Sequence, residues 1–227
     1  MADLRQYPDL VNATTTTSPR LTVVAHPLVE DCLARLRDIE TTTAEFRRAA
    51  RLLTQLLLFE ATRDLPLAGS RIETPLEATT VNRIGRPIVL VPVLRSGLAM
   101  LDTATDMFPD ARVGFVGLER DEHTAIPRGY YRKLPTPIDT AAVMILEPML
   151  ATGGSALASL EIAKADGARD VRLICAVAAP EGVRAVHERV PDCAIYTATL
   201  DRGLNDRKFI MPGLGDFGDR YFGTVPL

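Results

Sequence analysis

Cysteine and histidine are scarce in this chain of 227 residues, which contains three of each. The cysteines Cys32, Cys175 and Cys193 lie far apart, without the paired spacing of a zinc site or of a disulfide framework. No histidine has another nearby, which argues against a metal site built from histidines, and His26 is interpreted as structural. An odd number of isolated cysteines favours a reducing compartment, so we expect a cytoplasmic protein.

The chain also lacks a large excess of positive or negative charge and any long apolar run. The net charge of −3 gives no electrostatic footprint for a nucleic acid, so no nucleic-acid partner is expected. No run has the length and apolarity of a membrane span, so no membrane partner is expected either. The first twenty residues lack the apolar core of a secretory signal.

The length predicts one large domain, or one domain with an appendage. Because 47% of the residues are hydrophobic, the chain can bury a substantial core. Residues 1–20 are polar and contain the run Thr14–Thr17, so we expect a flexible N-terminal tail. Residues 21–227 are expected to form the single domain.

Apolar runs alternate with helical patterns, which predicts an α/β fold with a parallel sheet. The runs lack polar alternation, as in strands that are covered on both faces. The predicted strands are Pro87–Leu94, Arg112–Leu118, Val143–Leu146, Val171–Ala178 and Ala194–Thr199. The predicted helices are Pro27–Arg37, Thr43–Thr62, Leu98–Met107 and Ser155–Ala165. An arm of short strands is predicted over Leu67–Asn82.

The helix predicted over Thr43–Thr62 is too apolar to bury only one face. Thr42 and Glu45 form a capping box at its start. One face carries Phe46, Ala49, Leu53 and Leu57, and it is widened by Leu52, Leu56 and Phe59. We expect such a helix to pack under its own domain and against a second subunit.

The alternation of strands and helices breaks between Glu119 and Thr140. This polar stretch contains three prolines and the cations Arg120, Arg128, Arg132 and Lys133. We interpret residues 119–140 as a lid loop, because cations here would face a phosphate site across the sheet edge. A solvated surface loop is the alternative.

The segment Val143–Ser155 carries the clearest chemistry. An acid, Glu147, follows the apolar strand at its carboxyl end, where open α/β sheets bind ligands. Thr152-Gly153-Gly154-Ser155 then leads into a helix, whose amides and dipole favour an anion. The segment therefore predicts a phosphate cradle, with a carboxylate that can accept hydrogen bonds from sugar hydroxyls. The alternative is an ordinary strand–turn–helix, whereas a P-loop is excluded because no Lys-Ser or Lys-Thr follows the glycines.

The segment Gly213–Gly218 matches the G-x-G-x-x-G pattern of dinucleotide-binding folds. That pattern requires a helix and a further strand after it. Only nine residues follow Gly218, and Asp219–Gly223 has no helical period, so a nicotinamide site is rejected.

Glu147–Ser155 resembles the phosphoribosyl pyrophosphate (PRPP) loop of type I phosphoribosyltransferases, in the form seen in the uracil phosphoribosyltransferase family. The similarity runs from about Val24 to Gly223 and includes Glu60–Asp64, Ala179–Gly182, Leu200–Asn205 and Phe209–Asp219. The resemblance implies a parallel-sheet type I phosphoribosyltransferase fold with N-terminal helices and a small β-arm or hood contributed by the C-terminal segment, about residues 207–223. The chain departs from the family at Glu147, where Asp is usual, at Ser96, where Ala is usual, and at Phe217, where bacterial members often have Ala.

The reaction that the resemblance implies is uracil plus PRPP to UMP plus diphosphate, with Mg²⁺, through an oxocarbenium-like state. It assigns PRPP binding to Arg95, Arg120, Glu147, Pro148, Met149, Leu150, Ala151, Thr152, Gly153, Gly154, Ser155 and Asp216. It assigns catalysis to Asp216, Arg120 and Glu147, and uracil binding to Ile210, Gly215, Asp216 and Phe217. No residue is expected to bind the metal directly, because PRPP would carry Mg²⁺ and Asp216 would act on it through water.

The resemblance also implies a homodimer or homotetramer, and GTP as a possible allosteric activator. Two other functions stay open at this point. A regulatory relative could keep the PRPP loop and bind RNA, although the chain has no basic cluster. The acceptor could also be another base, although Lys208 is the only cation just before Gly213 that could pair with the carboxylate of orotate.

Overall fold

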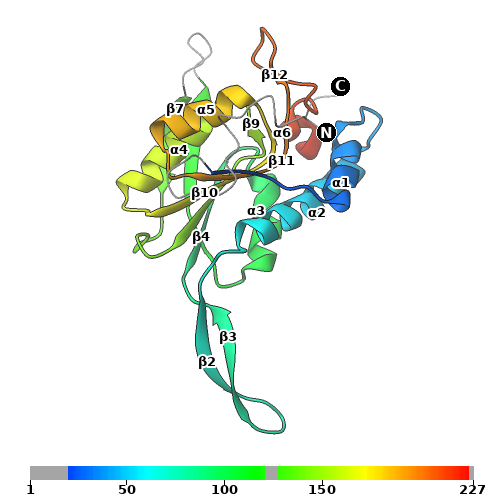
Figure 1. Cartoon of the computed structure of the whole chain (residues 1–227). Coiled ribbons are helices and arrows are strands. Elements are labelled where there is room, and N and C mark those ends of the chain that lie inside the picture. The colour runs from blue at the N-terminus through cyan, green and yellow to red at the C-terminus, as the bar shows by residue number, and fades with distance from the viewer. Residues whose placement is uncertain (1–19, 121–126, 225–227) are drawn as a thin grey trace.

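The computed structural model describes residues 20–120 and 127–224 (Figure 1). Residues 1–19, which make up almost all of the expected flexible tail, lie outside the described part of the chain. Residue 20 instead begins the first strand of the fold, β1 (Arg20–Val23).

Nine of the described strands form one large sheet with the order β1-β11-β10-β8-β4-β6-β7, in which β5 also pairs with β4 and β9 with β10. Every strand pair in it is parallel except β6–β7. The strands are β4 (Ile88–Leu94), β5 (Arg112–Val113), β6 (Phe115–Arg120), β7 (Pro127–Lys133), β8 (Ala142–Leu146), β9 (Met149–Leu150), β10 (Asp170–Ala178) and β11 (Ala194–Leu200). The predicted α/β class with a parallel sheet is confirmed.

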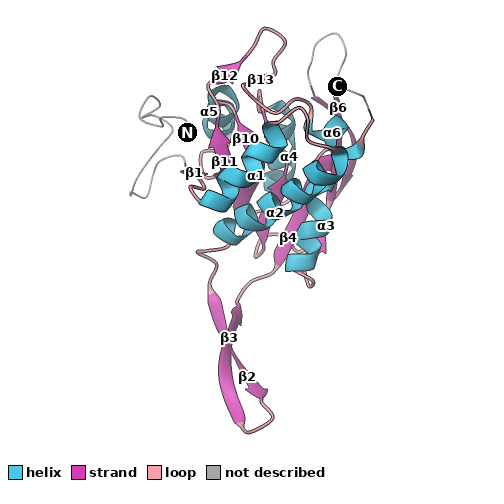
Figure 2. Ribbon diagram, turned by 90° about the vertical axis from the view of Figure 1, so that its right-hand side faces the viewer, coloured by secondary structure: helices cyan, strands magenta, loops and turns pink. Residues whose placement is uncertain are grey.

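Helices cover both faces of this sheet, which explains why its central strands lack polar alternation (Figure 2). One face packs against α1 (Pro27–Arg37), α2 (Thr43–Ala61), α3 (Leu98–Met107) and α6 (Phe217–Phe222). The other face packs against α4 (Gly154–Ala165) and α5 (Pro180–Arg189). All five residues of β8 are completely buried, so the strand before Glu147 lies in the centre of the core.

The start of α2 has the predicted capping box. The Thr42 side chain accepts a hydrogen bond from the Glu45 amide, and the Glu45 carboxylate accepts one from the Thr42 amide. This reciprocal pairing satisfies two donors at the helix start. The helix remains apolar on its outer side, where Phe59 is 63% exposed.

The predicted arm over Leu67–Asn82 is an antiparallel hairpin of β2 (Leu67–Glu73) and β3 (Ala78–Ile84). The hairpin projects away from the body of the molecule in both views (Figures 1 and 2). Its side chains are largely exposed, and Leu76 at the turn is 95% exposed.

Two predictions about the middle of the chain need correction. The single strand predicted over Arg112–Leu118 is divided into β5 and β6 at Gly114, where a Cβ atom would lie 2.7 Å from Leu134 Cδ2. The expected lid loop, residues 119–140, is partly strand: β6 continues to Arg120 and β7 returns antiparallel to it, whereas residues 134–140 contain no strand. Its role as a lid stays a prediction. Tyr130 and Tyr131 are aromatic residues, which favour strands, but the polar composition around them had led to the prediction of a loop. Residues 121–126 lie outside the described part.

The expectation that Asp219–Gly223 is not helical is wrong. Residues Phe217–Phe222 form α6, capped by the Asp216 side chain and ended by Gly223 in the left-handed region. The helix is too short for a period to be recognised, and its stability comes from packing. The ring of Phe217 stacks on Tyr221, one turn later, and meets Phe46 of α2 edge-on.

Among the helices of residues 20–120 and 127–224, none combines the length and the apolarity that crossing a membrane requires.

Candidate active site

The carboxyl ends of neighbouring parallel strands bring three separate segments together. Glu147 follows β8, Arg95 follows β4, and the C-terminal segment lies beside the turn after β4. A Cβ atom at Gly97 would lie 2.3 Å from the Leu146 carbonyl oxygen, and one at Gly218 would lie 3.7 Å from Ser96 Cβ. Only glycine at position 97 allows the turn after β4 to approach the end of β8 this closely.

The loop between β8 and α4 has two parts: its first residues pair with β10, and its last residues form a turn. Met149 and Leu150 pair with β10 as β9, and the Pro148 carbonyl accepts hydrogen bonds from the amides of Ala176 and Val177. These first loop residues therefore anchor the loop to the sheet. The remaining residues, Ala151 to Ser155, form the turn into α4.

The turn itself has the geometry of an anion site. Gly153 has φ +84°, a conformation that favours glycine, and no side chain caps the start of α4. The first amides of a helix have no partner within the helix, so the amides here can donate to a bound anion. The hydroxyls of Thr152 and Ser155 are partly exposed beside them.

Glu147 is the most unusual acid in the site. Its Oε2 atom is buried and has no hydrogen-bond partner within the described part of the chain. Burial without a positive neighbour raises the pKa of its carboxyl group from the ordinary 4.5 to about 8. This shift favours the neutral form of Glu147, and a neutral carboxyl group can both donate and accept a hydrogen bond.

Arg95 is available for a ligand. Its side chain is 64% exposed, and its guanidinium makes a single long contact of 3.4 Å with Asp219 Oδ1. Arg120 is the last residue of β6, which pairs with β4 and ends at the same sheet edge. The Arg120 side chain lies outside what the structure describes, so its role in binding PRPP stays a prediction.

The predicted uracil segment presents backbone rather than side chains. Ile210 is 5% exposed and pairs with Leu204 between β12 (Gly203–Leu204) and β13 (Ile210–Met211). Phe217 is 3% exposed, with its ring directed into the aromatic cluster of the core. Gly213 and Gly215 have φ +63° and +80°, so the backbone between these two residues turns sharply.

Asp216 has a structural contact that the sequence did not reveal. Its Oδ1 atom accepts a 2.8 Å hydrogen bond from the Asp219 amide as the N-cap of α6. Capping uses one carboxylate oxygen of this exposed residue. The carboxylate lies next to the turn that holds Arg95, because Gly218 lies against Ser96.

Sequence reasoning missed three further residues at the edge of this segment: Arg37, Asp201 and Arg220. Asp201 lies within a motif of the family resemblance, but nothing in the sequence indicated its partners. The two arginines gave no signal, because their contacts join parts of the chain more than 160 residues apart.

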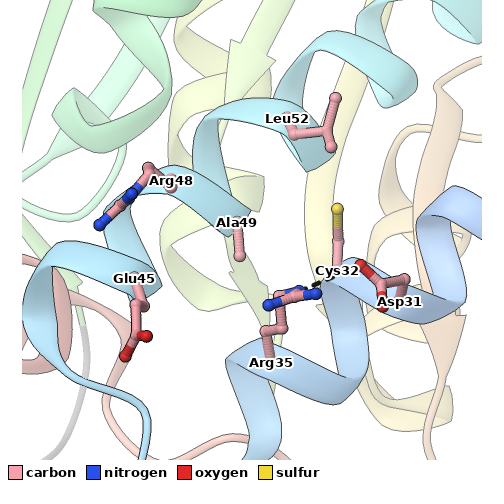
Figure 3. A pocket seen from close by; sticks show the side chains of 7 residues that line it. All are labelled: Asp31, Cys32, Arg35, Glu45, Arg48, Ala49 and Leu52. Carbon is pink, nitrogen blue, oxygen red and sulfur yellow. Dashed lines mark hydrogen bonds and ion pairs between the residues drawn. The ribbon is translucent and has the colours of Figure 1, made fainter.

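A cavity of about 260 Å³ is lined by residues of α1 and of the first part of α2 (Figure 3). It opens between α1 and α2 and shares no residue with the predicted site. Three of its charged groups have local partners, since Arg35 donates to Asp31 at 3.0 Å and Glu45 belongs to the capping box.

Comparison with known proteins agrees with this geometry. The family model "Uracil phosphoribosyltransferase" matches residues 23–224. A uracil phosphoribosyltransferase of Symbiobacterium thermophilum is 46% identical over 90% of this chain and 99% of its own length. One of Bacillus cereus is 48% identical with the same coverage. The AQ2163 protein of Aquifex aeolicus has a solved structure with a TM-score of 0.86 and 34% identity, covering 91% of this chain and all of that one. The chain belongs to the uracil phosphoribosyltransferase family.

Proposed function

We propose that this protein transfers the 5-phosphoribosyl group of PRPP to uracil, giving UMP and diphosphate in pyrimidine salvage. The observation that carries the proposal is the family match over residues 23–224, which includes every residue of the candidate site. The open turn before α4 and the unpartnered carboxyl group of Glu147 support it independently.

PRPP would lie along the carboxyl edge of the sheet. The turn residues Ala151–Ser155 would hold its 5′-phosphate through amides and hydroxyls, while Pro148, Met149 and Leu150 support that turn. Glu147 would bind the ribose 2′- and 3′-hydroxyls. In the neutral form it can donate to one hydroxyl and accept from the other, which suits a diol.

The leaving diphosphate requires positive charge. Arg95, exposed beside Asp219, and Arg120 would bind its oxygens, because a guanidinium can hold two oxygens at once. As positive charge develops at ribose C1, the carboxyl oxygens of Glu147 beside the ribose would stabilise that charge electrostatically.

Mg²⁺ fits this site as a partner of the substrate. The described residues contain no group of three or more acidic, histidine or cysteine side chains that could hold a metal ion. Mg²⁺ commonly binds through substrate phosphates with only one or two carboxylates, and Asp216 is available to act through water. When bound, the ion would neutralise charge on the diphosphate.

Uracil presents an acceptor, a donor and an acceptor along one edge. Backbone groups of Ile210, Gly215 and Phe217 would provide the complementary donors and acceptor. The side chains of Ile210 and Phe217 are buried, which supports this proposal because at these two positions only the backbone can face the base.

We propose further that the protein is a homodimer or homotetramer held partly by the β2–β3 arm. An isolated two-stranded hairpin is marginally stable in water, and this one exposes Leu67, Leu76 and Ile84. Replacement of residues 69–82 by Asn-Gly should therefore shift the mass in solution toward the 24.7 kDa protomer in light scattering. An unchanged mass would assign the interface elsewhere.

A cytoplasmic location is proposed because Cys32, Cys175 and Cys193 are all buried and free, as expected in a reducing compartment.

The function is tested with uracil, cytosine, orotate, hypoxanthine and xanthine, each given with PRPP and Mg²⁺. We expect UMP from uracil and no nucleotide from the other bases. Comparable turnover of orotate or a purine would contradict the proposal. Activation by GTP stays a prediction, which the same assay checks with and without GTP.

A further inference from the structure

Three charged side chains outside the predicted site fasten the turn that carries the proposed base-binding groups. They come from three elements: Arg37 ends α1, Asp201 follows β11, and Arg220 lies in α6. None of them is assigned a role in binding substrate by the proposed function.

Asp201 and Arg37 hold both backbone groups of Gly213. The Gly213 amide donates to Asp201 Oδ2 at 2.9 Å, and the Gly213 carbonyl accepts from Arg37 Nη1 at 3.0 Å. The same guanidinium grips Asp201 with a fork, at 2.7 Å to Oδ1 and 3.0 Å to Oδ2. Asp201 is 4% exposed, so this ion pair is largely shielded from water.

Arg220, which follows the turn in the sequence, binds Leu214 and connects it to the end of α1. Its Nη1 atom donates to the Leu214 carbonyl at 2.9 Å and also to the Leu36 carbonyl, while Nη2 donates to the Asp38 carbonyl. The last carbonyls of a helix lack partners within the helix, and cations are favoured there. Arg220 thus joins the end of α1 to the turn, with its guanidinium 4.6 Å from the Phe46 ring centre.

The two arginines therefore both connect the end of α1 to the Gly213–Leu214 turn. Arg37 reaches from α1 to the turn, and Arg220 reaches from beyond the turn back to α1. Together with Asp201 they bind three successive backbone groups: the Gly213 amide, the Gly213 carbonyl and the Leu214 carbonyl. Gly215 and Phe217, whose backbone groups are proposed to bind the base, follow within three residues.

A turn that reads a base through its backbone needs such support. Glycines at positive φ in this turn provide no side chains that could fix it, and a Cβ at Gly213 would lie 2.2 Å from the Ile210 carbonyl oxygen. Binding groups must be held close to their productive geometry by neighbours that are themselves fixed. Buried, charge-assisted hydrogen bonds meet this requirement better than exposed ones.

We propose that Arg37, Asp201 and Arg220 are positioning residues for the nucleobase, which set the affinity for uracil and its discrimination from cytosine by fixing the Gly213–Leu214 turn. The inference rests on the proposed base-binding role of Ile210–Phe217. It makes the end of α1 part of the base site without contact between α1 and the base.

The test uses Arg37→Lys and Arg220→Lys, which keep the charge but lose the planar fork. Arg86→Lys is a matched control: Arg86 pairs with Asp170 at 2.8 Å and donates to the carbonyls of Thr140 and Ala141, at the other end of the strands. Steady-state kinetics is measured for both substrates, together with the melting temperature and the ratio of uracil to cytosine turnover.

We expect the KM for uracil to rise about tenfold in both site variants, equal to about 1.4 kcal/mol, with the KM for PRPP unchanged. Discrimination against cytosine should fall in the same variants. Arg86→Lys should lower the melting temperature without changing either KM. Arg37 is 26% exposed, so Arg37→Lys carries the test if Arg220→Lys does not fold.

Three results would overturn the inference. A lower melting temperature with both KM values unchanged, or changed equally, would make the three residues structural only. Gly215→Ala strains the backbone at φ +80° within the proposed base-binding segment itself. It distinguishes a failure of the positioning role from a failure of the proposed base site. If Gly215→Ala raises the KM for uracil and Arg37→Lys does not, the positioning role fails while the base site stands. If neither variant changes it, the base site is wrong and the inference fails with it.

Discussion

The two ends of the central strands contain the same kinds of residue, but the carboxyl ends leave Arg95 loosely paired and a Glu147 oxygen without a partner in the described chain, beside the satisfied Arg37–Asp201 pair. At the amino ends, Arg172 is bound by Asp170 and Asp64, and Arg86 binds Asp170 at 2.8 Å. At the carboxyl ends, Arg95 is 64% exposed and Glu147 has a buried oxygen without a partner. The buried strands are continuous between the two ends, so core packing does not explain the difference.

The difference separates residues that stabilise the fold from residues kept ready for substrate. A buried polar atom without a partner costs free energy, and a fold retains such an atom where a ligand completes it. The amino end shows that this sheet can satisfy its charges with arginine–aspartate pairs. We infer that the unsatisfied groups at the carboxyl end are a property of the site.

The sharpest way to break this comparison is Asp216→Asn. Asparagine caps helices as well as aspartate does, so the fold of α6 should remain and the melting temperature should change little. The negative charge is lost, and turnover should fall about a thousandfold, equal to about 4 kcal/mol of transition-state stabilisation. Steady-state kinetics checks this. Normal turnover would mean that Asp216 serves only as a helix cap.

Glu147→Ala should follow in size. It removes two hydrogen bonds to the ribose hydroxyls, each contributing about 0.5–1.5 kcal/mol for a neutral group, so kcat/KM for PRPP should fall about tenfold to a hundredfold. The affinity for uracil should change little, because backbone of another segment is proposed to bind the base. Glu147→Asp should be mild and provides the control. Wild-type efficiency in the alanine variant would remove Glu147 from the ribose site.

Asp170→Asn applies the same kind of change at the amino end. It weakens the ion pairs with both Arg86 and Arg172, so the free energy of unfolding should fall by roughly 2 kcal/mol. Both KM values should stay at the wild-type level. Urea titration and kinetics on the same preparation measure the two effects. A selective change in either KM would show that the two ends are coupled, which contradicts the comparison.

The pH dependence of stability offers a smaller but direct test of Glu147. Burial raises its pKa to about 8, so between pH 4.5 and 8 the folded state holds a proton that the unfolded state has lost. The stability that the neutral group contributes is therefore lost as the pH rises through about 8. Glu147→Gln stays neutral, so its stability relative to wild type should increase toward pH 8 by up to about 1.4 kcal/mol per pH unit. A constant difference from pH 5 to 9 would mean that Glu147 is ionised throughout.

The sequence predicted what local patterns determine. The apolar run Val143–Leu146, the capping box of α2 and the boundaries of α3 all depend on neighbouring residues, and each prediction is confirmed. The helix α6 was missed because six residues carry too little pattern and its aromatic contacts with Phe46 come from a distant helix. The β6–β7 hairpin was missed because the composition of residues 119–140 resembles that of a loop.

The features of the candidate site also divide into those that local sequence predicts and those that depend on the fold. The glycine turn before α4 and the acid after β8 could be predicted, because strand, acid and turn are consecutive in the sequence. The buried state of Glu147 could not, since it depends on how the surrounding elements close over the carboxyl group. The contacts of Arg37 and Arg220 could not be predicted either, because each joins residues that only the fold brings together.

A crystal structure of the protein with UMP tests the central claim most directly, because UMP contains both the phosphate and the base. The account predicts that the 5′-phosphate accepts hydrogen bonds from the amides of residues 152–155, with the ribose hydroxyls at Glu147. It predicts that the uracil edge faces the backbone of residues 210–217. Ordered UMP bound elsewhere, with the turn before α4 empty, would contradict the assignment of the carboxyl edge as the active site.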